Sequence, residues 1–184
     1  MSYGLDQERV LFLYVGRVDR DKSLEVLLEA LRERDRDDVQ VGIAGHGSAL
    51  ESLRARAQRL ALRRRVAFAG YVPAPDLPAL LNSADIFCMP SEVELQSIAT
   101  LEAMATGRPV LAADALALPE LVQDGVNGYL FEPGCPQDAA RYMAKLADHP
   151  EAWAAMGAAS LEMVQPHRFD HTLRQYEAVY RSLC

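Results

Sequence analysis

Six short runs of apolar and β-branched residues recur along the chain, and polar or helical segments separate them. They lie at residues 10–15, 39–44, 66–70, 85–89, 109–113 and 128–131. Each run is apolar almost throughout instead of alternating with polar residues. This pattern is typical of parallel strands that are buried on both faces, so we predict six such strands.

Apolar residues at helical spacing occupy the segments between these runs. The clearest sets are Leu24, Leu27, Leu28 and Leu31; Leu50, Leu53, Ala57 and Leu60; and Ile98, Leu101 and Ala105. From Pro136 onward the pattern predicts three helices and no further strand. Strands that alternate with helices indicate an α/β fold, a doubly wound, Rossmann-like parallel sheet, here formed as one domain over residues 1–184. Such sheets bind ligands at the carboxyl ends of their strands, so candidate residues are sought in the loops there.

Composition narrows the possible functions of this domain. The chain has 184 residues, half of them apolar, and a net charge of −7, which argues against nucleic acid as a partner. Its three cysteines, Cys88, Cys135 and Cys184, are far apart and lack the spacing of metal ligands. Together with the lack of an N-terminal leader or a membrane-spanning run, they predict a cytoplasmic protein with reduced thiols.

The segment after the first strand reads GRVDRDKSLEVL and carries two cations. Gly16 permits a tight turn, Arg17 and Lys22 supply positive charge, and Ser23 is expected to cap the following helix. Cations beside a helix N-terminus suit a phosphate or diphosphate. A capped helix with solvated charges explains the same residues equally well.

The loop after the second strand reads GHGSAL, and Gly45 and Gly47 in it would permit close approach of a ligand. A dinucleotide fingerprint requires a third glycine where Leu50 stands, so a nicotinamide-dependent dehydrogenase is disfavoured. His46 either faces solvent or contacts the ligand.

After the third strand, Gly70, Tyr71 and Val72 lead into a proline-rich turn, and Asp76 is expected to cap a short helix. Backbone exposed at this strand end could bind the edge of a nucleobase. A turn with no ligand is the alternative.

Two acids, Glu94 and Glu102, follow the fourth strand and are eight residues apart. On one helix they would be separated by about 12 Å along its axis, which is too far for the carboxyl pair of a glycosidase. The separation suits a ligand held at both ends, with the N–H groups of residues 95–98 facing an anionic middle. A nucleoside diphosphate sugar has this form, with Glu94 at the sugar and Glu102 at the ribose.

These motifs together resemble the retaining glycosyltransferases of family 4, which have the GT-B fold. Glu94-x7-Glu102 followed by AMATGRPVLA is similar to the E-x7-E signature of that family. YVGRVDRDKSLEVLLEAL resembles its G-R-x-x-x-x-K-G phosphate loop. VGIAGHGS, VAFAGYV and LPELVQDGVNGYLFEPG follow in the family's order, so the resemblance covers residues 10–181.

The resemblance implies a role for each motif residue. Arg17 and Lys22 would bind the donor diphosphate and stabilise the leaving group, while Glu94 would hold the sugar and Glu102 the ribose. Tyr71 and Val72 would border the nucleobase. Backbone amides would cover the sugar and phosphate at Leu95, Gln96, Ser97 and Ile98. The family transfers the sugar with retention and requires no metal ion or other cofactor.

The chain departs from the family where a Gly-Phe-Gly-Leu-Pro-like run is common after the first Glu. Its residues there are Leu95, Gln96, Ser97, Ile98 and Ala99. We expect Gln96 or Ser97 to contact the sugar and affect donor choice. Ser23 replaces the glycine common after the Lys, and Glu92 is expected to be a solvated neighbour without a role.

The resemblance extends only to the C-terminal, donor-binding lobe of a GT-B enzyme. The N-terminal acceptor lobe would be in the same chain or in a separate subunit, and membrane association would be possible only through that lobe. The terminal segment HRFDHTLRQYEAVYRSL resembles the terminal helix that, in full-length members of the family, packs back across the cleft between the two lobes. We expect this helix to expose part of an apolar face. Phe169, Leu173, Tyr176 and Tyr180 would supply that face.

Three functions remain open at this stage. They are the donor-binding half of a retaining glycosyltransferase, the donor subunit of a split enzyme, and a non-enzymatic module that binds nucleotide sugars. A sugar epimerase of related fold is disfavoured by the E-x7-E context.

Overall fold

The computed structural model describes residues 3–33 and 36–183. Its centre is one six-stranded sheet in which all neighbouring strands are parallel, in the order β3-β2-β1-β4-β5-β6. The strands are β1 (Val10–Val15), β2 (Val39–Ala44), β3 (Val66–Gly70), β4 (Ile86–Met89), β5 (Val110–Ala113) and β6 (Gly128–Phe131). All six predicted strands are therefore confirmed, within one residue at each end.

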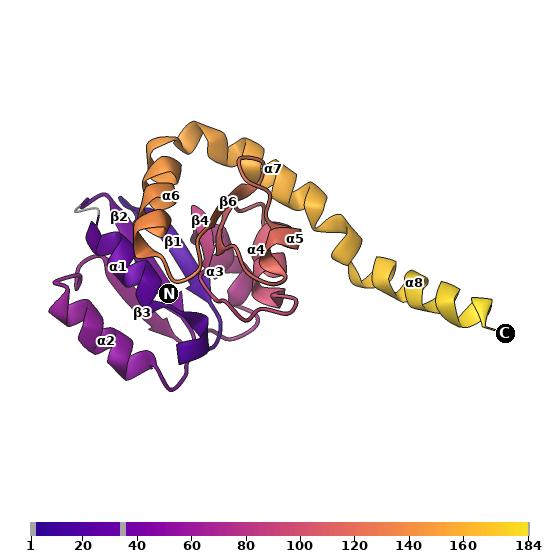
Figure 1. Ribbon diagram of the computed structural model, residues 1–184, viewed down its shortest axis with the longest axis horizontal. Coiled ribbons are helices and arrows are strands. Elements are labelled where there is room, and N and C mark those ends of the chain that lie inside the picture. Colours follow the sequence, from indigo (N-terminus) through magenta and orange to yellow (C-terminus); the bar gives the residue numbers. More distant parts are fainter. Residues whose placement is uncertain (1–2, 34–35, 184) are drawn as a thin grey trace.

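Helices cover both faces of the sheet (Figure 1). They are α1 (Glu25–Glu33), α2 (Leu50–Arg59), α3 (Leu77–Ser83), α4 (Ile98–Ala105), α5 (Leu118–Leu121), α6 (Pro136–Asp148), α7 (Trp153–Met163) and α8 (Phe169–Ser182). Right-handed crossovers place α1 and α2 on one face and α3, α4 and α5 on the other. Beyond the sheet, α6 packs against α1 and α7 packs against α4. The doubly wound fold and the three C-terminal helices are confirmed.

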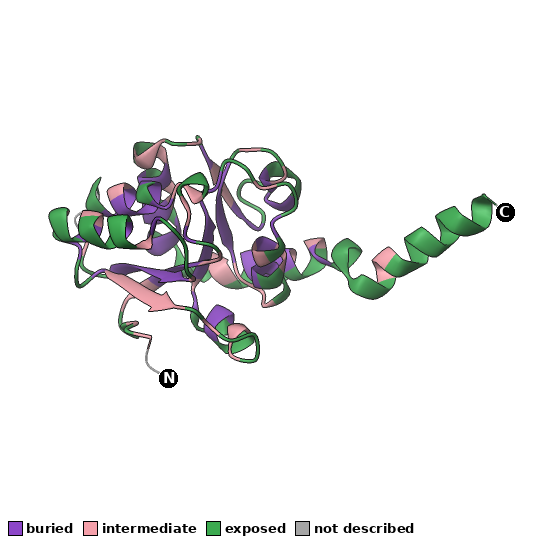
Figure 2. Cartoon of the chain, turned by 90° about the horizontal axis from the view of Figure 1, so that it is seen from below, coloured by how far each residue is buried: buried purple, intermediate pink, exposed green. Residues whose placement is uncertain are grey.

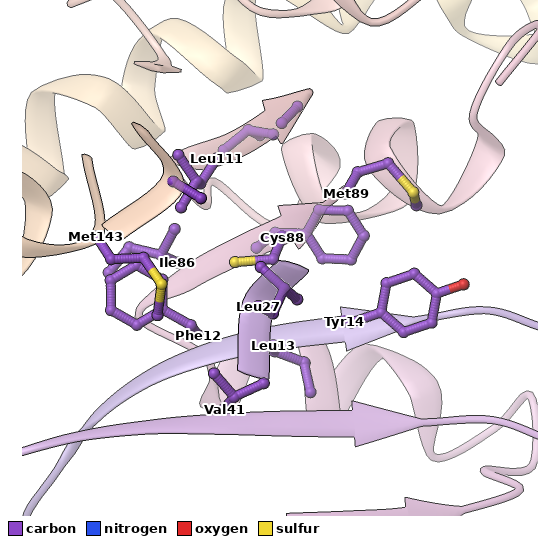
Figure 3. Close-up of a cluster of buried hydrophobic side chains, with 14 of the residues drawn as sticks. Phe12, Leu13, Tyr14, Leu27, Val41, Ile86, Cys88, Met89, Leu111 and Met143 are labelled. Carbon is purple, nitrogen blue, oxygen red and sulfur yellow. The ribbon is translucent and has the colours of Figure 1, made fainter. Parts of the chain in front are cut away.

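The core lies between the sheet and its helices. Figure 3 shows Phe12 and Ile86 of the two central strands gathered with Leu27 of α1 and Met143 of α6. All four side chains are buried, and burying a side chain of this size contributes roughly 1.5–3 kcal/mol. Apolar residues on both faces of each central strand thus account for the fully apolar runs in the sequence.

Short 3₁₀ helices connect several elements, namely η1 (Arg20–Lys22), η2 (Pro150–Ala152) and η3 (Gln165–His167). After η3, α8 extends away from the rest of the molecule (Figure 1), and it has no buried residue (Figure 2). Phe169, Leu173, Tyr176 and Tyr180 are exposed, as expected.

Cys88 is buried in β4, and Cys135 is partly exposed; both are free thiols. Cys184 lies outside the described residues. Among the helices of residues 3–33 and 36–183, none combines the length and apolar character needed to cross a bilayer.

Candidate donor-binding site

Strands β1 and β4 are neighbours in the sheet, with Phe12 paired to Ile86 and Leu13 to Phe87. The chain leaves β1 toward one face of the sheet and β4 toward the other, so a crevice forms at their carboxyl ends. Two loops border it: the β1–α1 segment (residues 16–24) and the β4–α4 loop (residues 90–97). Most of the candidate residues lie in these two loops.

An ion pair joins the two loops across the crevice. Lys22 Nζ donates to Glu94 Oε1 at 2.7 Å, and the two side chains are only 12% and 14% exposed. The hydroxyl of Ser91 also donates to the carbonyl oxygen of Asp21, at 3.3 Å. The structure thus brings together two candidates that the sequence separates by 72 residues.

Arg17 lies at the outer end of the same segment, and its side chain is 68% exposed. Its guanidinium pairs with Asp19 at 2.7 Å and with Asp21 at 3.4 Å. Asp19 is held in place because the Ser48 N–H and hydroxyl both donate to it at 2.8 Å. The hydrogen bond from the Ser48 N–H is the largest cause that lowers the pKa of the Asp19 carboxyl. The bond from the Ser48 hydroxyl and the positive charge of Arg17 lower this pKa further. Sequence reasoning missed this anchor, although Asp19 lies within the phosphate-loop motif.

The glycines of the loops after β1 and β2 allow two stretches of backbone to touch. A Cβ on Gly45 would lie 1.8 Å from the Gly16 carbonyl oxygen, and one on Gly47 would lie 2.2 Å from that of Val18. Gly16 itself leaves room for the Tyr14 hydroxyl, which would be 2.7 Å from an added Cβ. We expected Gly45 and Gly47 to permit close approach of a ligand. In the structure both permit close approach of the neighbouring loop, and Gly45 also lines a cavity beside that loop.

Tyr14 was not predicted as part of the site. Its buried hydroxyl donates to the carbonyl oxygen of Arg17 at 2.6 Å and so fixes the turn at Gly16. Burial, followed by the nearby charges of Glu94 and Asp21, raises the pKa of this phenol, which therefore stays protonated and able to donate. The only sequence signal for this role is a hydroxyl on an otherwise apolar strand, two residues before a glycine.

A cavity of about 300 Å³ opens beside the β1–α1 segment. Its lining residues come from the ends of β1 and β2, from the loops after β1, β2 and β3, and from α3: Val15, Gly16, Arg17, Ala44, Gly45, His46, Tyr71, Val72 and Leu77. The rings of His46 and Tyr71 stack with centroids 5.9 Å apart and planes 11° apart. The structure therefore places the predicted base-binding residues in one pocket next to Arg17. Asp76 precedes α3 but makes no capping bond with its side chain.

Two serines stand where the family motifs have glycine, and both have left-handed backbones. Ser23 has φ 48° and Ser97 has φ 52°. Ser97 is buried, and its hydroxyl bonds Thr100 Oγ1 at 2.7 Å. Ser23 does not cap α1 as expected, because its hydroxyl faces Glu92 at 3.4 Å. The serines thus keep a conformation that glycine adopts without strain.

The β4–α4 loop presents free N–H groups next to the ion pair. Among the described residues, no acceptor bonds the backbone N–H groups of residues 95–99. Leu95 is 87% exposed, and Gln96 and Ile98 are also exposed. Since the Ser97 hydroxyl is turned toward Thr100, Gln96 is the polar side chain left on the open side of this loop.

Glu94 and Glu102 do not share one helix. Glu94 lies in the β4–α4 loop, and α4 begins only at Ile98, so Glu102 alone is helical. The axial separation expected for two residues on one helix therefore does not apply to Glu94 and Glu102. Glu102 is exposed, yet partial desolvation raises the pKa of its carboxyl. Glu92 is exposed as well, at the rim of the crevice.

Taken together, the crevice combines two cations, a run of free N–H groups and an acid beside a pocket with aromatic walls. Free N–H groups at a helix start and neighbouring cations are the usual donors for phosphate oxygens. Over residues 3–33 and 36–183, no three His, Cys, Asp or Glu side chains gather as metal ligands would.

Comparison with known proteins identifies the class that this fold and site define. The model of the family of glycosyl transferases group 1 matches residues 2–163, and the chain belongs to that family. The resemblance noted in the sequence and the GT-B-type fold are thereby confirmed.

Individual relatives are similar over most of this chain. A D-inositol 3-phosphate glycosyltransferase of Streptomyces griseus subsp. griseus is 35% identical, over 96% of this chain and 40% of its own length. An alpha-D-kanosaminyltransferase of Streptomyces kanamyceticus is 34% identical, over 81% of this chain and 39% of its own. The chain therefore spans about two fifths of these relatives.

A solved structure, HepE from Anabaena in complex with UDP, superposes with a TM-score of 0.86 at 27% identity. The match covers 96% of this chain and 50% of HepE.

Proposed function

We propose that this chain is the donor-binding half of a retaining glycosyltransferase and binds a nucleoside diphosphate sugar in the crevice between β1 and β4. The observation that carries the proposal is the convergence of Lys22, Glu94 and the free N–H groups of residues 95–99 at that crevice. Similarity to glycosyltransferases and to a UDP-bound enzyme supports it.

The diphosphate takes the middle of the site in this proposal. Lys22 and Arg17 contact it from the β1–α1 segment, and the N–H groups before α4 contact it from the opposite side. As the sugar leaves, negative charge grows on the diphosphate, and donors already fixed in place stabilise that charge. The proposal assigns this task to the two cations and the amides and includes no metal ion.

The two ends of the donor lie on either side of the diphosphate. The nucleobase enters the pocket beside Tyr71 and Val72, and Glu102 accepts hydrogen bonds from the ribose hydroxyls. At the other end, Glu94 accepts from the sugar hydroxyls, and the exposed Gln96 contacts the sugar. The reaction proceeds with retention, by attack on the same face from which the diphosphate departs.

The acceptor is bound by a second lobe, either in the same chain or in a separate subunit. The exposed apolar side chains of α8 support this part of the proposal, because they form a stripe that the described residues leave uncovered. Alone, the chain binds the donor and transfers little or no sugar.

Calorimetric titration tests donor binding. The chain is titrated with UDP-, GDP- and ADP-glucose and with the three free diphosphates. We expect heat of binding from nucleotides of at least one base, and an affinity weaker by about tenfold or more in Lys22→Met. Lys145→Met is the matched control, because Lys145 lies over the Tyr129 ring, away from the crevice. Absence of binding by all six nucleotides would contradict the proposal.

A further inference from the structure

The positive charge of Lys22 is already engaged before a ligand arrives. Its Nζ lies 2.7 Å from Glu94 Oε1 and 3.4 Å from Asp21 Oδ2. Because Lys22 and Glu94 are both mostly shielded from solvent, salt screens their attraction less than that of a surface pair. Any phosphate that uses Lys22 must share it with Glu94.

The proposed reaction would bring two nucleotides to the site, the nucleotide sugar and the free nucleoside diphosphate. Sharing Lys22 with Glu94 affects the binding of these two differently. An ammonium group has three donors, so Lys22 can contact a phosphate and Glu94 together. The phosphate then lies near the Glu94 carboxylate, and like charges at such short range repel each other.

A free nucleoside diphosphate carries its full charge next to Glu94 and offers that carboxylate no donor. A nucleotide sugar has an esterified, less charged terminal phosphate, and its sugar hydroxyls can donate to Glu94. The same carboxylate is therefore unfavourable for one nucleotide and favourable for the other.

We infer that Glu94, through its ion pair with Lys22, makes the site select the nucleotide sugar over the free nucleoside diphosphate. Glu94 thus acts as a specificity-determining residue that weakens retention of the leaving group after transfer. This inference rests on the proposed function, since it assigns a second role to a residue of the same site.

Isothermal titration of Glu94→Gln with UDP, GDP, ADP and their glucose esters tests the inference, using the base that the unmodified chain binds most tightly. The amide keeps the size of the side chain and removes its charge. We expect the free diphosphate to bind about three- to tenfold more tightly and the nucleotide sugar to bind no more tightly than before. A general loss of structure would weaken the binding of both ligands and so could not produce tighter binding of the free diphosphate.

Glu92→Gln is the matched control. It removes one negative charge from the same loop, but Glu92 contacts Ser23 and not Lys22. We expect it to change either affinity by less than about twofold. Glu94→Ala is the second variant, should the amide fail to fold, and it carries the same expectation as Glu94→Gln.

Unchanged or weaker binding of the free diphosphate in the Glu94 variants overturns the inference, and so does an equal gain in Glu92→Gln. Either result leaves the proposed function intact if the unmodified chain binds a nucleotide sugar. If the unmodified chain binds no nucleotide at all, it is the proposed function that fails.

Discussion

A Cβ atom built on Gly45 would lie 1.8 Å from the carbonyl oxygen of Gly16. The backbones after β1 and β2 therefore touch at a point where only glycine fits, and the N–H of Gly45 also donates to the Gly70 carbonyl oxygen at 2.7 Å. This contact fixes the base of the loop that carries Arg17 and Lys22. Gly16 and Gly45 thus shape the site through their contact with each other, and both also line the cavity beside it.

Gly45→Ala is expected to lower the free energy of unfolding by about 2–4 kcal/mol, since it combines a backbone clash with φ +143°. Urea denaturation measures this loss. Gly125→Ala is the matched control, because Gly125 also has positive φ but no atom within 4 Å of an added Cβ. That variant should lose only about 1 kcal/mol of unfolding free energy. Equal losses in the two variants would show that the contact between the loops does not exclude a side chain at position 45.

The two left-handed serines should respond differently to glycine. Ser23→Gly relieves backbone strain and loses only a weak, exposed contact to Glu92, so we expect stabilisation by about 0.5–1 kcal/mol. Ser97→Gly relieves similar strain but breaks the buried bond to Thr100, so its net effect should be near zero. Ser97→Ala keeps the strain and loses the bond, and it should be the least stable of the three in chemical denaturation. Stabilisation by Ser97→Ala would contradict the assignment.

Lys22 and Arg17 should contribute unequally to donor binding. Lys22 is shielded and fixed by its contact with Glu94, whereas Arg17 is exposed and its charge is screened by solvent. Lys22→Met should weaken nucleotide-sugar affinity by about tenfold or more and Arg17→Met by about threefold, as measured by calorimetry. A larger loss in Arg17→Met would mean that Arg17 is the main phosphate ligand.

Removal of α8 should leave the rest of the domain intact. The helix has no buried residue and projects from the body of the molecule (Figure 2). A chain that ends at Arg168 should unfold within about 2 °C of the full chain and bind nucleotide equally well, since little apolar surface would be lost from the core. Thermal unfolding followed by circular dichroism measures the first effect. A drop of many degrees would show that α8 packs on the domain in solution.

Much of the fold could be predicted from the sequence, because each central strand is apolar on both faces and each helix repeats its apolar positions. The strand ends then indicated which loops border the crevice. In this way Gly16, Arg17 and Lys22 were placed in a loop at the crevice, and Tyr71 and Val72 in the loop after β3.

The contacts between loops could not be predicted. The Lys22–Glu94 bond joins residues 72 positions apart, and it depends on β1 and β4 being neighbours in the sheet. Local sequence also gives no indication that Gly45 meets Gly16, or that Ser97 adopts a left-handed backbone and turns its hydroxyl inward. Local propensity favoured Ser23 as a helix cap, but its left-handed backbone turns the hydroxyl toward Glu92 instead.

The place where a nucleotide sugar binds tests the central claim most directly. An NMR titration of the ¹⁵N-labelled chain with the preferred nucleotide sugar reports on each backbone N–H separately. We predict the largest shifts at residues 16–23, 71–72 and 95–98, on the two loops of the crevice and at the base pocket. A larger cavity, of about 720 Å³, lies at the opposite end of β1 and is bordered by Asp6, Arg9 and Asp85. Shifts confined to that cavity, with the crevice unchanged, would contradict the account.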